Sequence, residues 1–331
     1  MAGNFVFGRP IGSSGLSRRA WITGSLVGGL GLLARAGEPK GAGAVDATAG
    51  TIEKFQAEAR KTGLGSFRTT ETAHFLGIGD GPERYRRRAL EICQELAAAY
   101  QKHFREKGFT TVALPEDRLT VVTLKDRASY EKFLRENAGP DVGGHFDLDA
   151  NCLVIYDFRP PADEPVANAE RVNTFTLVHE GLHLLTFNTG LLNRRGDVPL
   201  CLSEGLAAYG EAWRPSARAP FGQYNAFRRD VLAKEPDLGN AWHPAAKLLG
   251  DDKLLNDAKT AQLAYAQSWV LVHHLMKTPA KLRGFRTYLG AIRDRKDASK
   301  RLEDASKHLG DLDRLDRDVK KYAGRLLEER S

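Results

Sequence analysis

The sequence has neither the phosphate-binding glycine loop of nucleotide-hydrolysing enzymes nor the glycine pattern of dinucleotide-binding folds, and no tandem repeat is evident. Cysteines are few as well. The three of them, Cys93, Cys152 and Cys201, cannot all pair within one chain, and the sequence does not decide whether two form a disulfide. No motif joins a cysteine to a histidine, so a cysteine nucleophile has no support.

The chain also lacks an apolar run of the ~20 residues that span a bilayer. Its most apolar stretch, Ala20 to Leu33, is shorter and follows Arg18-Arg19, which resembles the twin-arginine export consensus. Ala34-Arg35-Ala36 then matches a small-x-small cleavage site. We therefore expect residues 1–36 to be a twin-arginine-type signal peptide, with export to the periplasm or exterior and no stable membrane anchor after cleavage. A retained membrane anchor is the alternative.

Acidic residues are absent from residues 1–36, which contain four arginines. Without these arginines the formal net charge falls from +7 to +3, so the mature protein is nearly balanced. The basic run Arg84 to Arg88 is interpreted as the solvated face of a helix. Composition therefore argues against nucleic acid as a partner.

Composition divides the chain into four parts, of which residues 1–36, the predicted signal peptide, are the first. Residues 37–50 are rich in glycine and alanine and are predicted to be a flexible linker. Residues 51–160 are predicted to form an N-terminal α/β part, and residues 161–331 a mostly helical part that contains the candidate metal ligands.

Within the α/β part, helices are predicted over residues 51–61, 82–107 and 127–137. Segments rich in β-branched and aromatic residues predict strands over residues 67–78, 119–124, 144–148 and 152–158, the last two as a hairpin.

His179-Glu180-Gly181-Leu182-His183 carries the main chemical signal of the sequence. Two histidines four residues apart lie on one face of a helix, so both imidazoles can hold one ion. Zinc suits them because it accepts imidazole nitrogen at about 2.0–2.1 Å and needs few ligands. Glu180 is rotated by about 100° from His179, where its carboxylate can take a proton from an activated water without binding the metal. A helix with two solvated histidines is the alternative.

A second segment, Pro199 to Tyr209, predicts a short helix that carries Glu204, 21 positions after His183 (204 − 183). Small residues after Glu204 allow this helix to lie close to the first. As a third ligand, Glu204 leaves the fourth zinc position open, as a catalytic site requires. The sequence thus predicts one zinc ion per chain, held by His179, His183 and Glu204.

This pattern resembles the gluzincin metallopeptidases, the thermolysin and aminopeptidase N group, in which HExxH is followed about twenty residues later by a glutamate. From about residue 150 to residue 331 the chain looks most like bacterial peptidase MA-like proteins, many of which are known only as domains of unknown function. The resemblance implies peptide-bond hydrolysis by a metal-activated water, with Glu180 as general base. It does not separate endopeptidase from exopeptidase, because no motif that would recognise a substrate N-terminus precedes His179.

Further roles come only from the resemblance. Tyr265, on a predicted buried helix, matches the tyrosine that stabilises the oxyanion in aminopeptidase N-like enzymes, and a core tyrosine with an incidental hydrogen bond is its alternative. His243 or His273 could do that work instead. Glu211 matches an acidic position that orients a metal ligand, and a surface carboxylate is its alternative. The resemblance also allows residues 152–158 to be the strand that pairs with substrate, although ordinary sheet core is the better description of them.

Together these observations predict an α+β fold with a small mixed sheet, followed by a mostly helical gluzincin-type zinc-binding region. The expected function is that of an exported zinc metallopeptidase acting on peptides or proteins. Two alternatives stay open: a zinc-dependent hydrolase of a cell-wall or other non-protein amide, and an idle envelope binding protein on the same fold. The sequence does not determine the oligomeric state.

Overall fold

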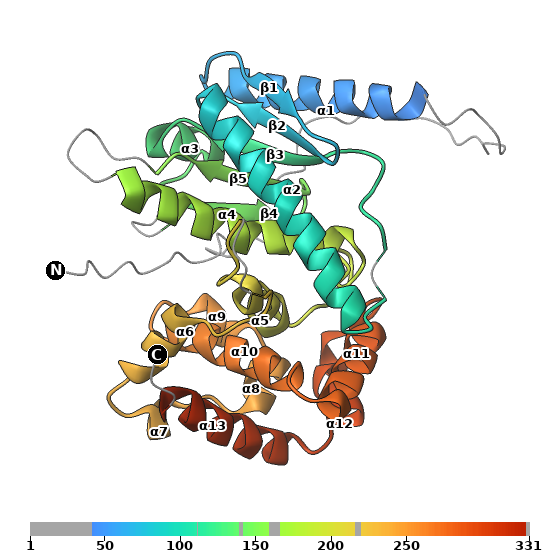
Figure 1. Cartoon of the computed structure of the whole chain (residues 1–331), viewed down its shortest axis with the longest axis vertical. Helices are drawn as coiled ribbons and strands as arrows, with labels where there is room; N and C mark the ends of the chain where they lie inside the picture. The colour runs from blue at the N-terminus through green and yellow to red at the C-terminus, as the bar shows by residue number, and fades with distance from the viewer. Residues whose placement is uncertain (1–41, 111, 139–141, 159–165, 216–219, 329–331) are drawn as a thin grey trace.

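The computed structural model describes residues 42–110, 112–138, 142–158, 166–215 and 220–328 (Figure 1). The predicted signal peptide and most of the loop before the metal-binding helix lie outside these residues. In Figure 1 the sheet and helices α1–α4 form the upper half of the molecule, and helices α5–α13 form the lower half. None of the described helices is long and apolar enough to cross a membrane.

The upper half contains a five-stranded mixed sheet with strand order β1-β2-β3-β5-β4. The three inner strands run parallel, and the two outer strands pair antiparallel to their neighbours. The strands are β1 (Arg68–Glu71), β2 (Phe75–Gly79), β3 (Leu119–Leu124), β4 (Gly144–Asp147) and β5 (Cys152–Tyr156). The small mixed sheet predicted from the sequence is therefore confirmed.

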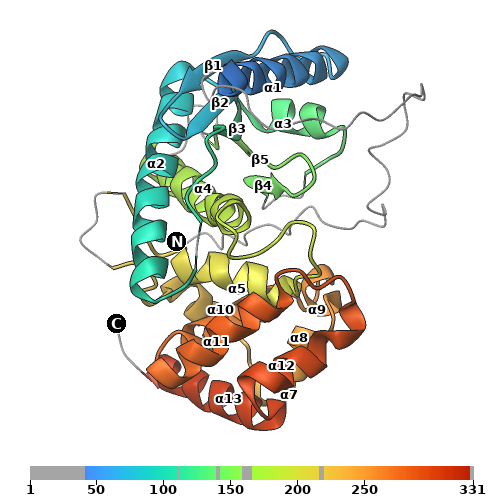
Figure 2. The ribbon, with the colours of Figure 1, turned by 90° about the vertical axis from the view of Figure 1, so that its right-hand side faces the viewer.

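Two helices cover each face of this sheet (Figure 2). Helices α2 (Glu83–Glu106) and α4 (Val166–Asn188) share the main hydrophobic core with one face of the sheet. Helices α1 (Ala42–Lys61) and α3 (Arg127–Leu134) share a smaller core with the other face. The candidate metal-binding motif thus lies on a helix that is packed along the sheet.

Three predicted element boundaries differ from the structure. The segment 67–78 forms two strands rather than one, because the chain turns back at Thr72, whose N–H donates to the carbonyl of Phe75. Helix α3 ends at Leu134, since Arg135 adopts a left-handed conformation with φ of 60°. Helix α1 begins at Ala42, inside the predicted linker, as the alanine content of that stretch allows.

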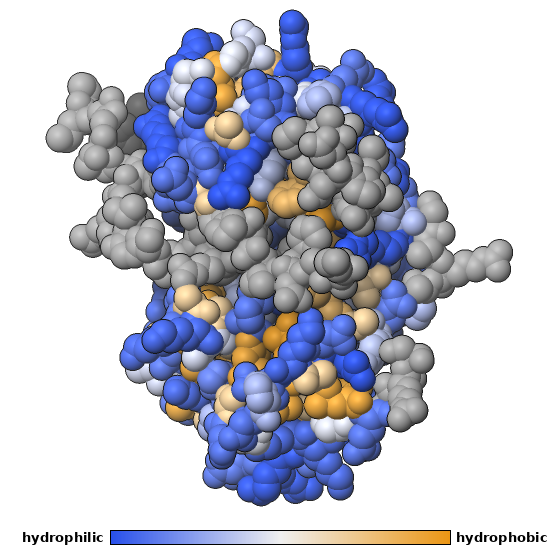
Figure 3. Space-filling model, turned by 90° about the vertical axis from the view of Figure 1, so that its left-hand side faces the viewer, coloured by the Kyte–Doolittle hydropathy of each residue, from blue (hydrophilic) through white to orange (hydrophobic). Residues whose placement is uncertain are grey.

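All the secondary-structure elements in the described residues of the lower half are helices. Its helices are α5 (Leu200–Gly210), α6 (Ala226–Ala233), α7 (Leu238–Ala241), α8 (Ala245–Gly250), α9 (Lys253–Asn256), α10 (Ala261–Leu275), α11 (Pro279–Ile292), η1 (Ala298–Lys300), α12 (Arg301–Leu309) and α13 (Leu312–Glu328). The main core continues from α2 and α4 through α5 into α10, which is buried along nearly all of its length. Figure 3 shows hydrophilic residues over the lower end of the molecule, where α13 runs. The predicted α+β class is confirmed.

Helix α5 is packed tightly against α10 at Gly205, the residue after the candidate ligand Glu204. A Cβ atom at Gly205 would lie 2.6 Å from the carbonyl oxygen of Ser268 and 2.6 Å from a methyl group of Val272. The absence of a side chain therefore lets the ligand helix approach the buried helix.

We expect Gly205→Ala to lower the free energy of unfolding by about 1–3 kcal/mol, because the added methyl group overpacks this contact. Gly290→Ala is the matched control, since a Cβ atom there meets nothing within 4 Å. It should raise helix stability by up to ~1 kcal/mol. Urea denaturation of both variants measures the difference, and equal effects would contradict the close packing at Gly205.

Candidate metal centre

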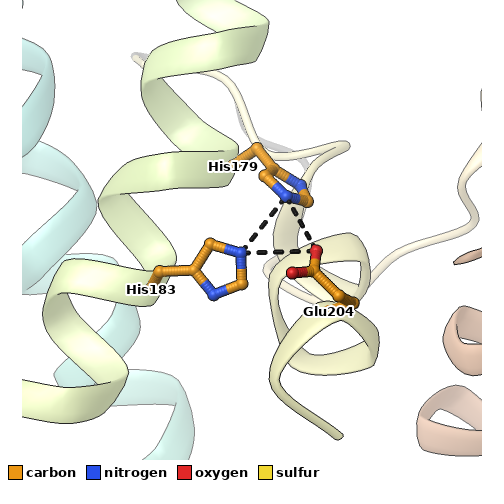
Figure 4. Close-up of side chains that lie close together, drawn as sticks. All are labelled: His179, His183 and Glu204. Atoms are coloured by element: carbon orange, nitrogen blue, oxygen red, sulfur yellow. Dashed lines mark hydrogen bonds and ion pairs between the residues drawn. The ribbon is translucent and has the colours of Figure 1, made fainter. Parts of the chain in front are cut away.

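The candidate ligands lie where α4 passes over α5, between the two halves of the molecule (Figures 1 and 4). The other faces of helix α4 are packed into the core by four fully buried residues: Val178, Leu182, Leu184 and Leu185. Gly181 faces α2, where a Cβ atom would lie 3.1 Å from a methyl group of Leu96. The two histidines therefore lie on a helix that is packed against the core on several sides.

His179, His183 and Glu204 converge on one point (Figure 4). The two Nε2 atoms are 3.3 Å apart, and Oε2 of Glu204 lies 3.2 Å from the first and 3.4 Å from the second. Two ligands about 2.0–2.1 Å from one tetrahedral ion are separated by about 3.3–3.4 Å. The three atoms are thus spaced as ligands of a single ion are, and this group could hold a metal.

The second nitrogen of each imidazole has its own partner. Nδ1 of His179 lies 2.6 Å from Glu211, and Nδ1 of His183 lies 3.0 Å from the hydroxyl of Ser203. When each Nδ1 carries the proton and donates it to that oxygen, each Nε2 presents a bare lone pair toward Glu204. This tautomer is the one that a cation requires.

Glu211 is itself held by buried groups. It is completely buried just beyond the end of α5, and Asn225 donates to its Oε2 from 2.8 Å. The guanidinium of Arg228 donates to both carboxylate oxygens, with 2.8 Å from Nε to Oε2. Burial alone would raise the pKa of Glu211, but Arg228 and His179 together outweigh burial and hold the pKa well below its ordinary value. The carboxylate therefore stays ionised beside His179.

The imidazoles and carboxylates at the convergence point shift one another's pKa. Burial alone would lower the pKa of His179, but the carboxylates of Glu204 and Glu211 raise it to about 10. Burial alone would raise the pKa of Glu204, but His183 and His179 lower it to about 2. Oε2 of Glu204 is buried and, apart from the two imidazole Nε2 atoms 3.2 and 3.4 Å away, has no hydrogen-bond partner within the described part of the chain. A cation at this point would satisfy that oxygen.

One family model matches residues 173–297. Its description is "Protein of unknown function (DUF1570)", and the matched segment contains every candidate ligand together with Tyr265. No curated protein matches the chain. The match therefore spans the candidate ligands and assigns them no activity.

Glu180 lies beside the ligands and faces the strand β4. Its Oε2 accepts a hydrogen bond of 2.9 Å from the main-chain N–H of Phe146, and no other hydrogen bond to it occurs among the described residues. Burial raises its pKa, which favours a carboxylate that can accept and return a proton. Glu180 is half-buried and lies outside the triangle of candidate ligand atoms.

Tyr265 lies on α10 with its ring beside the guanidinium of Arg228, 5.4 Å from the ring centre. Its hydroxyl is buried and has no hydrogen-bond partner in the described residues. Burial raises the pKa of Tyr265 well above its usual value, and the charges of Glu204 and Glu180 raise it further. The hydroxyl is therefore a protonated donor within electrostatic range of the site.

The two alternative histidines lie elsewhere. Nδ1 of His273 is 2.8 Å from the hydroxyl of Tyr322 on α13, and the charges that act on its pKa are lysines. The main chain of His243 exchanges hydrogen bonds with Gln267, and Lys247 is the one charge that acts on its pKa. The charges of Glu204 and Glu180 act on the pKa of Tyr265, whereas lysines are the charges that act on the pKa of each of these histidines.

Strands β4 and β5 both pack against α4. The segment 152–158 contributes the inner strand β5, which is the ordinary sheet core that its sequence favoured over a strand that pairs with substrate. Strand β5 lies between β3 and β4 and has neighbours on both sides. Strand β4 is the edge strand, with no partner on its other side among the described residues. The ring of Phe146 on β4 stacks against His183 and Phe187, with centroids 6.5 and 5.8 Å away. The wall of the site is therefore apolar on this side.

The loop that joins α4 to α5 borders the same strand. Arg194 donates to the carbonyl of Leu148, just after β4, at 3.3 Å, while Arg195 is exposed. Asp197 fixes the loop by pairing with Arg301, which also holds the carboxylate of Asp252. These contacts attach the start of the ligand helix α5 to the C-terminal helices.

We expect Ser203→Ala to weaken metal binding by about 10- to 100-fold, because His183 would lose the group that fixes its tautomer and orientation. Ser268→Ala is the control, since that buried hydroxyl bonds only the carbonyl of Ala264 and touches no ligand. Competition with a chromogenic chelator measures both affinities. Equal affinities in the two variants would show that Ser203 does not orient His183.

Proposed function

We propose that this chain is an exported, zinc-dependent metallopeptidase. The observation that carries the proposal is the convergence of His179, His183 and Glu204 on one point with Glu180 directly beside it. Two imidazoles and one carboxylate leave a fourth position open, which is the arrangement of catalytic zinc sites. Structural zinc sites use four protein ligands, and no fourth candidate ligand joins this group in the described part of the chain.

Zinc is favoured by the donor set and by the spacing of the ligands. Imidazole nitrogen with one carboxylate suits zinc, whereas magnesium and calcium take oxygen ligands almost exclusively. When bound, zinc supplies Lewis acidity to the scissile carbonyl and lowers the pKa of water at the open position.

Glu180 acts as the general base and acid in this proposal. Its carboxylate takes a proton from the attacking water and passes it to the leaving amine. A pKa raised by burial suits this work, because the group must accept a proton and release it within one turnover.

The hydroxyl of Tyr265 donates a hydrogen bond to the oxyanion that develops on the former carbonyl oxygen. Such a donor is worth most where water is excluded, and Tyr265 is about 3% exposed. Its hydroxyl has no partner in the described residues, so no existing hydrogen bond has to break before it binds the oxyanion. The substitution Tyr265→Phe would remove this hydroxyl and keep the aromatic ring.

A peptide is favoured over other amides by the free edge of β4. An edge strand presents unpaired main-chain groups that can pair with an extended chain. The apolar wall of Phe146 and Phe187 lies on the same side, where it can receive a substrate side chain. A compact cell-wall or small-molecule amide would make no use of a strand edge.

The test is cleavage of a mixed peptide library by the chain without residues 1–36, first freed of metal and then reloaded with zinc. We expect cleavage that depends on zinc, with sites that favour an apolar residue beside the scissile bond. Zinc binding without cleavage of any peptide would contradict the peptidase and support another amide substrate or a binding role.

A further inference from the structure

One main-chain N–H links the edge strand to the candidate general base. Phe146 lies opposite Leu153 in the β4–β5 register, and its N–H donates to Oε2 of Glu180 at 2.9 Å. In an antiparallel pair, alternate residues direct their main-chain groups away from the partner strand. The N–H of Phe146 therefore belongs to the free edge of the sheet.

This hydrogen bond fixes a side chain that otherwise has little to hold it. It is the only hydrogen bond to the side chain of Glu180 among the described residues. A hydrogen bond from a neutral donor to a carboxylate is shorter and stronger than one between neutral groups. It occupies Oε2 and leaves Oε1 as the oxygen that can meet a water.

The residue that supplies this N–H also touches a ligand. The ring of Phe146 is stacked on His183 with an interplanar angle of 17°. One residue of β4 therefore sets the position of the candidate base through its main chain and borders a ligand through its side chain. No helix supplies a comparable contact to Glu180 in the described residues.

We infer that the main-chain N–H of Phe146 is a positioning group for catalysis, which holds the Glu180 carboxylate in the orientation that proton transfer requires. The inference rests on the proposed function. It also limits substrate binding, because this N–H is already engaged. A peptide on the edge of β4 can use the carbonyl of Phe146 and the main-chain groups of Gly144, which face the same edge.

The competing possibility is that the N–H leaves Glu180 when substrate arrives and pairs with the substrate main chain. The two cases differ in kinetics. Loss of a group that orients the base lowers kcat and leaves KM unchanged, whereas loss of uniform binding raises KM and leaves kcat unchanged.

The experiment compares Phe146→Pro with Phe146→Ala. Both variants lose the ring, and only proline loses the N–H. Proline is tolerated on an edge strand where the N–H points away from the sheet, so the β4–β5 pairing can persist. We expect kcat of Phe146→Pro to be about tenfold to a hundredfold below that of Phe146→Ala, with equal KM and the same zinc content. Equal kcat values, or a difference confined to KM, would overturn the inference.

A second substitution keeps the test decisive if the proline variant fails to fold. Replacing the Phe146 residue with its α-hydroxy acid converts the N–H to an ester oxygen and retains the ring. It should lower kcat relative to the wild type without changing KM, and an unchanged kcat would overturn the inference. A wild-type chain that binds zinc yet cleaves no peptide would instead overturn the proposed function, and the inference with it.

Discussion

Glu180→Gln is expected to lower kcat/KM for peptide cleavage by about 10²- to 10⁴-fold, the usual contribution of a general acid–base group. Glutamine keeps the shape of the side chain and can still accept the hydrogen bond from Phe146, but it cannot take a proton. Zinc content should not change, because Glu180 lies outside the ligand triangle. Steady-state kinetics on one cleaved peptide, with metal analysis of the same sample, measures both quantities.

Glu91→Gln is the control for the loss of a carboxylate, since Glu91 is exposed on α2 and its ion pair with Arg88 is also exposed. Its kcat/KM should equal that of the wild type. A Glu180→Gln variant with full activity and one zinc ion would show that another group moves the proton, and it would remove the role given to Glu180.

Glu211→Gln is expected to lower the free energy of unfolding by about 3–5 kcal/mol, because it leaves the guanidinium of Arg228 charged and buried without its counter-ion. Arg228 is about 3% exposed, so water cannot replace the lost carboxylate. The same change should weaken metal binding by about 10- to 100-fold, since His179 loses a charged partner at Nδ1.

Glu303→Gln provides the comparison, because Glu303 is an exposed residue of α12. It should change stability by less than about 0.5 kcal/mol. Urea denaturation of the zinc-free chains separates the effect on folding from the effect on the metal. An unchanged midpoint for Glu211→Gln would mean that the buried pair contributes nothing to the fold.

The candidate metal ligands could be proposed from sequence because the geometry of the two histidines is local. Helical spacing alone puts His179 and His183 on one face, and the motif then defines where a third ligand must come from. Glu204 required the resemblance to a known pattern, since nothing in its own helix shows that it points at His179. The side-chain triangle adds what neither argument supplies, which is a common distance among the three ligand atoms.

The groups around the ligands could not be predicted in the same way. Asn225 and Arg228 come from the start of α6 and reach Glu211 only through the packing of α6 against α10. An arginine in a short helix is usually exposed, and no periodic signal distinguishes Arg228 from Arg229. Ser203 directly precedes Glu204, but adjacent residues of a helix are rotated by about 100° from each other. Its position in the sequence therefore does not show that its hydroxyl reaches His183.

The identity of the edge strand was partly present in the sequence. Five consecutive apolar residues, Cys152 to Tyr156, are typical of an inner strand with parallel neighbours. The segment from Gly144 to Asp147 is shorter and partly polar. The hydrogen bond from Phe146 to Glu180 had no signal of this kind. Main-chain donors have no residue type, so a tertiary contact of this sort becomes visible only in coordinates.

The most direct test of the account is the zinc content of the purified, folded chain beside that of Glu204→Gln, measured by mass spectrometry of the metal. The account predicts one zinc ion per wild-type chain and loss of most of it in the variant, with circular dichroism showing that both are folded. A folded wild-type chain that takes up no zinc, or a variant that retains it fully, would contradict the metal centre built on His179, His183 and Glu204.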